Sequence, residues 1–209
     1  MGIYAGLYWG PGEGPSGEAA ADAIWTTWGL IQRTTGVDQW RELGMPSAEP
    51  IAWQDIGRLL ERGANRDDGA GLPIESLGRR LAVWDGVEGS FSAAVGGTGS
   101  RWTGNCLIKV PGLPASADEA WPIMRELIDI WHPAWGTWAT SDIRALGREA
   151  GLPRGRPPLG LLTWVRADIM SPFIGVGAVT VDGGTLYRFG DHVDDVSEAT
   201  ARAVIVPVV

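Results

Sequence analysis

The chain has 209 residues, of which 44% are hydrophobic and 20% are charged, a composition typical of a globular protein rather than a disordered or fibrous one. Asp and Glu number 25 against 17 Lys and Arg, and the net charge of −8 argues against binding nucleic acid or a membrane through a basic face. Because Cys106 is the one cysteine, an internal disulfide and every zinc site built from several cysteines are excluded.

The first third of the chain mixes strand and helix patterns. A segment rich in Gly and Pro follows the first apolar run, and Ser16 is a typical N-cap for the helix after it. Gly36 and Gly63 are typical of the residues at which helices end. In chain order we expect a strand at residues 3–9, helices at 16–34 and 53–62, a polar loop at 65–71, and a further helical segment carrying Ile74, Leu77 and Leu81.

Strand patterns dominate the rest of the chain. A glycine-rich turn at residues 96–99 predicts a hairpin between strands at 90–95 and 105–110. Then we expect a helix before Pro133, a strand at 135–140, a short helix at 142–150, central strands at 161–167 and 173–181, a hairpin through Val181-Asp182-Gly183-Gly184-Thr185 into a strand at 186–189, and a last helix at 197–204. The pattern predicts an α+β fold, an antiparallel sheet with helices packed mainly on one face, in a single domain over residues 1–209.

The helix before Pro133 has two competing starts. Ser116 and Glu119 form a capping box, whereas Pro122 is better placed in a first turn than six residues inside a helix. Either start places the same four apolar residues on one face, namely Ile123, Leu127, Ile130 and Trp131.

The twelve tryptophans admit two interpretations. Exposed indoles could stack on sugars or bases, or could anchor a protein interface. Buried indoles would instead fill the core, and Trp28 and Trp131 lie on apolar helical stripes that favour this role. We expect most of the tryptophans in the core, with one or two exposed.

Two acidic segments are candidate sites. Asp191-His192-x-Asp194-Asp195 could bind a divalent ion or serve acid–base chemistry, but an acidic run before a helix is more typical of a solvated or partner-facing loop. In Asn65-Arg66-Asp67-Asp68, either Arg66 pairs with an adjacent carboxylate or the segment is a presented recognition loop.

Catalytic and cofactor signatures are missing from the sequence. No phosphate-binding loop, nucleophile elbow or deaminase pattern is present, and Cys106 lies within a strand pattern typical of a buried, inert thiol. We therefore expect no enzymatic activity, no cofactor and no bound metal.

Spaced Trp, Gly and Asn motifs along most of the chain resemble the bacterial immunity protein 52 family. The motifs are Tyr4-x-Gly6-x-Tyr8-Trp9-Gly10, Asn65-Arg66-Asp67, Leu77-Gly78 with Leu81, Trp84-Asp85-Gly86, the strand beginning at Asn105, Trp131-x-Pro133, Trp135, and residues 161–165. The resemblance implies an α+β antitoxin that binds a cognate toxin domain, commonly a restriction-endonuclease-like nuclease, and protects the producing cell.

An acidic inhibitor would complement the basic substrate cleft of such a nuclease. We expect a cytoplasmic protein, because the sequence begins with no signal-peptide pattern and its apolar runs are too short to span a membrane. Homo-oligomerisation is compatible with the sequence, and the alternative functions are a tryptophan-rich carbohydrate- or ligand-binding module and, third, a hydrolase. The candidate toxin contacts are Asp67, Asp68, Glu88, Asp191, Asp194 and Asp195.

Overall fold

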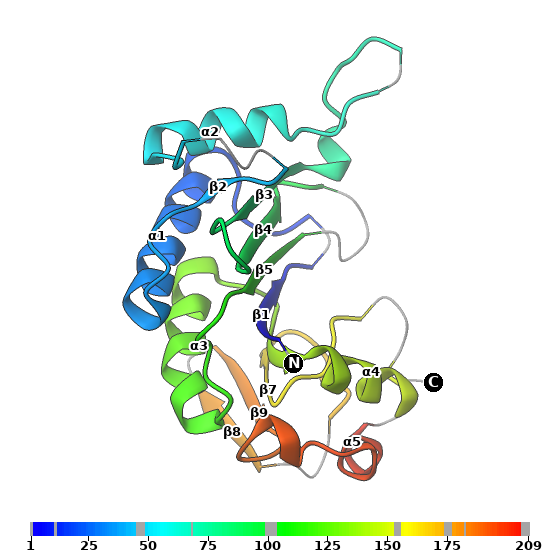
Figure 1. Ribbon diagram of the computed structural model, residues 1–209. Helices are drawn as coiled ribbons and strands as arrows, with labels where there is room; N and C mark the ends of the chain where they lie inside the picture. Colours follow the sequence, from blue (N-terminus) through cyan, green and yellow to red (C-terminus); the bar gives the residue numbers. More distant parts are fainter. Residues whose placement is uncertain are drawn as a thin grey trace.

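A nine-stranded antiparallel sheet forms the body of the protein (Figure 1). The computed structural model describes residues 2–10, 12–44, 49–67, 69–98, 104–152, 156–173, 177–181 and 183–205. The strand order is β2-β3-β4-β5-β1-β6-β7-β9-β8. The strands are β1 (Ile3–Tyr8), β2 (Arg41–Glu42), β3 (Arg79–Trp84), β4 (Ser90–Val95), β5 (Asn105–Lys109), β6 (Trp135–Thr140), β7 (Leu162–Arg166), β8 (Gly177–Val181) and β9 (Gly184–Arg188).

Five helices pack against this sheet, which confirms the expected α+β class. They are α1 (Gly17–Thr35), α2 (Trp53–Arg62), α3 (Ala117–Trp131), α4 (Ser141–Glu149) and α5 (Glu198–Val204), with short 3-10 turns η1 (Glu75–Leu77) and η2 (Val193–Asp195). None of the described helices is long and apolar enough to cross a membrane.

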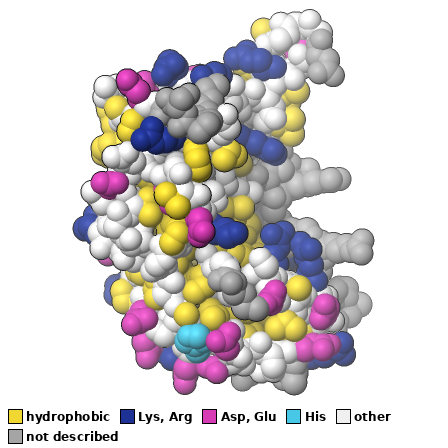
Figure 2. Space-filling view, viewed as in Figure 1, with side chains coloured by type: hydrophobic (Ala, Val, Ile, Leu, Met, Phe, Trp, Pro, Cys, Tyr) yellow, Lys and Arg dark blue, Asp and Glu magenta, His cyan; other side chains and the backbone are white. Residues whose placement is uncertain are grey.

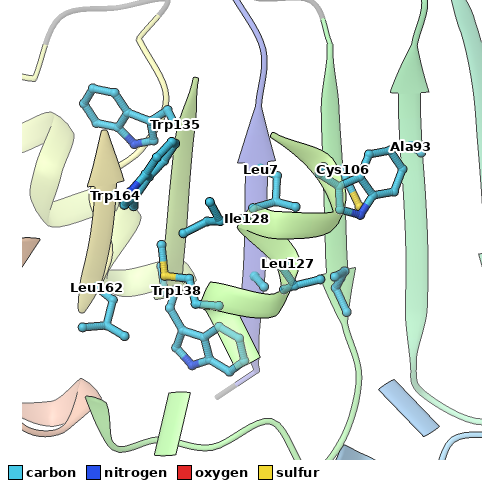
Figure 3. Close-up of a cluster of buried hydrophobic side chains, with 14 of the residues drawn as sticks. Leu7, Ala93, Cys106, Leu127, Ile128, Trp135, Trp138, Leu162 and Trp164 are labelled. Atoms are coloured by element: carbon cyan, nitrogen blue, oxygen red, sulfur yellow. The ribbon is translucent and has the colours of Figure 1, made fainter. Parts of the chain in front are cut away.

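Helices α1 and α3 pack on one face of the sheet, which we call the helix-covered face. Leu7 of β1 is paired with Gly136 of β6, and a Cβ at Gly136 would lie 3.0 Å from the terminal methyl of Met124 in α3. On the same face the ring of Trp28 in α1 lies 5.9 Å from the ring of Phe91 in β4. Figure 3 shows Leu127 and Ile128 of α3 beside Leu7. Helices α1 and α3 thus cover the middle of the sheet on this face, with α2 beside α1 (Figure 1).

Helix α4 lies on the opposite face. Tyr4 and Leu7 are three residues apart along β1, and side chains alternate between the two faces of a strand. The side chain of Tyr4 therefore points away from α3. Burial raises the pKa of the Tyr4 phenol, and Arg144 and Arg148 of α4 act on it electrostatically in the opposite sense. The helices are therefore mainly, though not all, on one face.

Most of the tryptophans are in the core, as expected from the sequence. Of the eleven that the structure describes, seven are buried and two, Trp25 and Trp53, are exposed. Buried indoles also make polar contacts: the Nε1 of Trp9 donates to the carbonyl of Trp131 at 3.1 Å, and the Nε1 of Trp131 donates to Oγ1 of Thr27 at 2.7 Å. These two bonds join β1, α3 and α1.

The competing starts of α3 are resolved in favour of Ser116. Its Oγ accepts the backbone N–H of Glu119 at 3.4 Å and donates to the Glu119 carboxylate at 2.9 Å. Pro122 consequently lies inside the helix. The buried face was only partly predicted, because Met124 and Ile128 are buried where Ile123 and Ile130 were expected.

Two other expectations were wrong. Residues 74–81 do not form a helix: after the η1 turn, Gly78 adopts a left-handed φ of 65° and β3 begins. A Cβ at Gly78 would lie 2.3 Å from the carbonyl oxygen of Val95, so the two backbones pass too close together for any side chain at position 78.

The strand expected at 173–181 is not central, since β8 is an edge strand whose side chains are largely exposed. Residues 174–176, Gly99 and Asp182 lie outside the described residues.

We predict that Thr27→Val lowers the free energy of unfolding by about 1–3 kcal/mol, because the buried indole N–H of Trp131 loses its acceptor. Urea denaturation followed by tryptophan fluorescence measures the loss. The matched control is Thr26→Val, whose exposed hydroxyl makes the same kind of bond to the carbonyl four residues earlier, and whose cost should stay within about 0.5 kcal/mol. Equal costs for both variants would contradict the structural role given to Thr27.

Candidate functional site

The structure brings together three of the predicted contact residues, Asp191, Asp194 and Asp195. They lie at and just before the η2 turn that follows β9. Glu88 lies in the turn between β3 and β4, at the same end of the strands but five positions away in the sheet, about 24 Å at the usual strand spacing. Asp68 lies outside the described residues.

Asp67 belongs to a different feature, the arm formed by residues 63–67 and 69–78. The arm projects from the end of α2, at the opposite end of the strands from η2 (Figure 1). One oxygen of Asp67 accepts the backbone N–H groups of Gly69, Ala70 and Gly71 at 3.0, 2.5 and 3.2 Å. These hydrogen bonds, that of Ala70 first, lower the pKa of Asp67. The carboxylate therefore shapes the arm itself.

Arg66 binds the backbone of its own loop. Its Nη1 donates to the carbonyl of Gly71 at 2.9 Å, so the described contact of the guanidinium is a backbone oxygen of its own loop. The arm places Leu72 at 61% exposure. This arrangement fits a presented loop better than a structural ion pair.

Three hydrogen bonds to backbone N–H groups hold the acidic turn together. Asp195 accepts the backbone N–H groups of Asp191 and His192 at 3.2 and 2.8 Å, and Nδ1 of His192 accepts the N–H of Asp194 at 3.4 Å. These bonds hold the turn as a capping box. Asp191 and Asp194 keep exposed side chains above it.

A fourth carboxylate, Asp118 of α3, joins the turn through Arg188. The guanidinium of Arg188 donates to Asp118 and Asp191, each at 2.6 Å, and the bond to Asp118 is the main cause that raises the pKa of Arg188. We call these four carboxylates, Asp118, Asp191, Asp194 and Asp195, the acidic rim. The guanidinium of Arg188 contacts two of these four carboxylates, so Arg188 and the rim together carry net negative charge, and Figure 2 shows Asp and Glu side chains gathered at this end of the molecule.

Backbone pairing fixes the rim to the start of α3. The N–H of Ala117 donates to the carbonyl of Asp191 at 2.9 Å, and the N–H of Val193 donates to the carbonyl of Ala115 at 3.0 Å. Ser116 and His192 form the antiparallel bridge between these bonds. The position of the rim relative to α3 therefore depends on main-chain geometry rather than on flexible side chains.

Next to the rim lies an apolar groove between α3 and strands β9 and β8, which we call the α3–β9 groove. It has a volume of about 670 Å³. Trp121 of α3 forms one wall, and Arg188, Asp118 and Asp191 close the acidic end. The apolar floor comes from Leu162, Val179, Val181 and Leu186.

The groove exists because the described helix layer stops short of the sheet edge. Trp164 of β7 is paired with Gly136, over which Met124 of α3 packs, whereas Leu186 and Val179 continue the same face beyond Trp164. No described helix covers these two strands on the helix-covered face, and Val179 is 56% exposed. A site of this shape suits a ligand with apolar groups and positive charge.

Trp121, Asp118 and Val179 were not expected from the sequence as site residues. A signal for Trp121 was available, since Ala117, Trp121, Met124 and Ile128 recur at helical spacing. Asp118 gave no local signal, because its partner Arg188 is distant in the sequence and is brought near only by the Ser116–His192 bridge.

In the described part of the chain, no three His, Cys, Asp or Glu side chains converge as a metal site. Cys106 is fully buried in β5, and burial raises the pKa of its thiol, in agreement with an inert core residue.

Comparison with known proteins shows a similarity of structure. No family model matches the chain, and no curated protein matches it. The solved structure of the Pseudomonas aeruginosa T6SS protein PA0821 is similar, with a TM-score of 0.53 and 11% sequence identity, over 96% of this chain and 73% of that one. At this identity the likeness concerns the fold, so the chain shares its α+β architecture, over nearly its whole length, with a protein of a type VI secretion system.

Proposed function

We propose that the protein is an immunity protein that neutralises a toxin domain by stoichiometric binding, and that the α3–β9 groove with its acidic rim is the contact surface. The observation that carries the proposal is the joining of an apolar floor, a tryptophan wall and a fixed set of carboxylates in one place. The sequence resemblance to the immunity protein 52 family and the fold shared with a T6SS protein support the same setting, competition between bacteria.

The groove has the composition expected of a protein-binding surface. Interfaces depend on a few aromatic or apolar anchors surrounded by polar residues that exclude water. Trp121 would supply the anchor and the rim would supply the polar border. A stable complex buries about 1,600 Å² in total, so the toxin would also cover surface around the groove.

A nuclease toxin is the partner that the charge favours. The substrate cleft of a nuclease is cationic because it binds phosphates, and carboxylates can occupy the same field. Four rim carboxylates against one guanidinium, on a chain with a net charge of −8, would attract such a cleft. Inhibition would then need no turnover and no cofactor, only occupation of the cleft or of a surface beside it.

A tryptophan-rich carbohydrate-binding module receives less support. It needs several exposed indoles in one row, whereas seven of the eleven described tryptophans are buried and two, Trp25 and Trp53, are exposed. Trp25 does line a cavity with the buried Trp28 and Trp40, but its volume of about 220 Å³ is below the usual range for ligand pockets.

The main test is co-expression with the toxin domain encoded by the adjacent gene. We predict that the wild-type protein restores growth, and that Trp121→Ala weakens binding to a catalytically inactivated toxin domain by about 30-fold or more in calorimetry, because an aromatic anchor is lost. Trp53→Ala, which removes an exposed indole on α2, is the matched control and should bind like wild type. Unchanged toxicity in the presence of the wild-type protein would refute the proposed function.

The rim should act mainly on the rate of association. We predict that Asp118→Asn with Asp194→Asn slows association with the inactivated toxin domain about tenfold at low salt and flattens its salt dependence, measured by stopped-flow fluorescence. Asp142→Asn with Glu149→Gln removes the same charge from exposed positions on α4, on the opposite face, and should leave the rate near that of wild type. Equal slowing by both pairs would assign the effect to net charge rather than to the rim.

A further inference from the structure

The two edges of the sheet differ in how they are protected. At one edge β2 has two residues, Arg41 and Glu42, both charged, which is how proteins usually discourage the pairing of exposed strands. At the other edge β8 has five residues, Gly-Ala-Val-Thr-Val, with neither a charge nor a proline. Its first four residues are exposed. An edge of this kind is a template for a further strand.

The register of the β8–β9 hairpin shows which backbone groups β8 offers. Val181 is paired with Gly184 across a two-residue turn, so this pair closes the hairpin as a hydrogen-bonded pair. Antiparallel pairs alternate, so Val179 and Gly177 also bond to β9, while Ala178 and Thr180 point their N–H and C=O groups away from it. Beyond β8, the described residues provide no strand to receive these groups.

We propose that the toxin supplies an extended segment that pairs with β8 as a tenth strand of the sheet. This inference rests on the proposed function and names its mode of binding. Ala178 and Thr180 supply the main-chain hydrogen bonds, and alternate side chains of the added strand enter the α3–β9 groove beside Val179.

The groove also dictates the sequence pattern of the added strand. Side chains on one face of a strand recur every second residue, about 6.6 Å apart. Apolar residues would lie beside Val179 and Val181, and the next position on the same face passes Gly177, which is paired with Arg188 next to the acidic rim. The added strand should therefore alternate apolar residues and carry Lys or Arg at the end that meets Asp118 and Asp191.

A basic partner is favoured over a second copy of this chain. Pairing of two β8 strands would bring together two molecules that each carry a net charge of −8 and an acidic rim beside the edge. Like charges at an interface slow association and lower affinity, whereas a cationic strand gains from the same field.

Thr180→Pro tests strand addition without removing the groove. Proline deletes an N–H that points away from β9, so the hairpin keeps its own bonds while the added strand loses a donor and meets the proline ring. We expect at least tenfold weaker binding to the inactivated toxin domain encoded by the adjacent gene. Thr180→Val keeps the N–H, so it measures the effect of the side chain separately from the loss of the donor. Hydrogen exchange on the wild-type complex provides a second readout, in which the amides of Ala178 and Thr180 become protected on binding.

The outcomes separate this inference from the proposed function. If Trp121→Ala loses binding while Thr180→Pro binds like wild type and the two amides stay unprotected, strand addition is wrong and the groove remains the contact surface. If Thr180→Pro does not fold, protection of the two amides in the wild-type complex decides. If light scattering shows that the wild-type chain is a dimer and that the Thr180→Pro variant is a monomer, β8 pairs with a second copy of this chain, and the proposal is overturned. A wild-type chain that does not protect cells from the toxin would remove both.

Discussion

The buried hydrogen bond from Trp131 to Thr27 is the contact on which the arrangement of this protein depends. It ties α3 to α1, and the bond from Trp9 to the Trp131 carbonyl ties the same residue to the end of β1. An indole is too large to shift without leaving a cavity, and its N–H cannot stay unpaired in the core without a cost of about 1–3 kcal/mol. The end of α3 is therefore fixed relative to the central strands.

The position of α3 decides where the proposed contact surface can form. Met124 packs over Gly136, where glycine leaves room for its methyl group, so the helix lies over β1 and β6. The start of the helix is fixed separately, by main-chain bonds to the acidic turn after β9. With both ends held, α3 leaves the last two strands open and places Trp121 along the opening. The groove is thus a consequence of how the core packs.

The sequence predicted the features that depend on neighbouring residues and missed those that depend on distant ones. Alternating apolar residues and glycine turns are local, so the strands and the β4–β5 and β8–β9 hairpins were expected. Near Gly78 the local signal was misleading, because Leu77 and Leu81 are at helical spacing while a close approach to Val95 requires a left-handed glycine. The acidic turn was recognised from Asp191, Asp194 and Asp195, but its joining to Asp118 depends on a bridge between segments far apart in the sequence.

The same arrangement explains how an unprotected edge can be kept on the surface. An uncharged strand such as β8 invites self-association, which proteins usually prevent with charges on the strand itself. Here the charges lie beside the strand, in the acidic rim and in a net charge of −8, and they would oppose the approach of a second copy. In the proposed complex, charge placed next to the strand would leave the backbone groups of β8 accessible to a cationic segment while opposing another copy. The rim would therefore select the partner while β8 and the groove hold it, which divides specificity and affinity between two adjacent sets of residues.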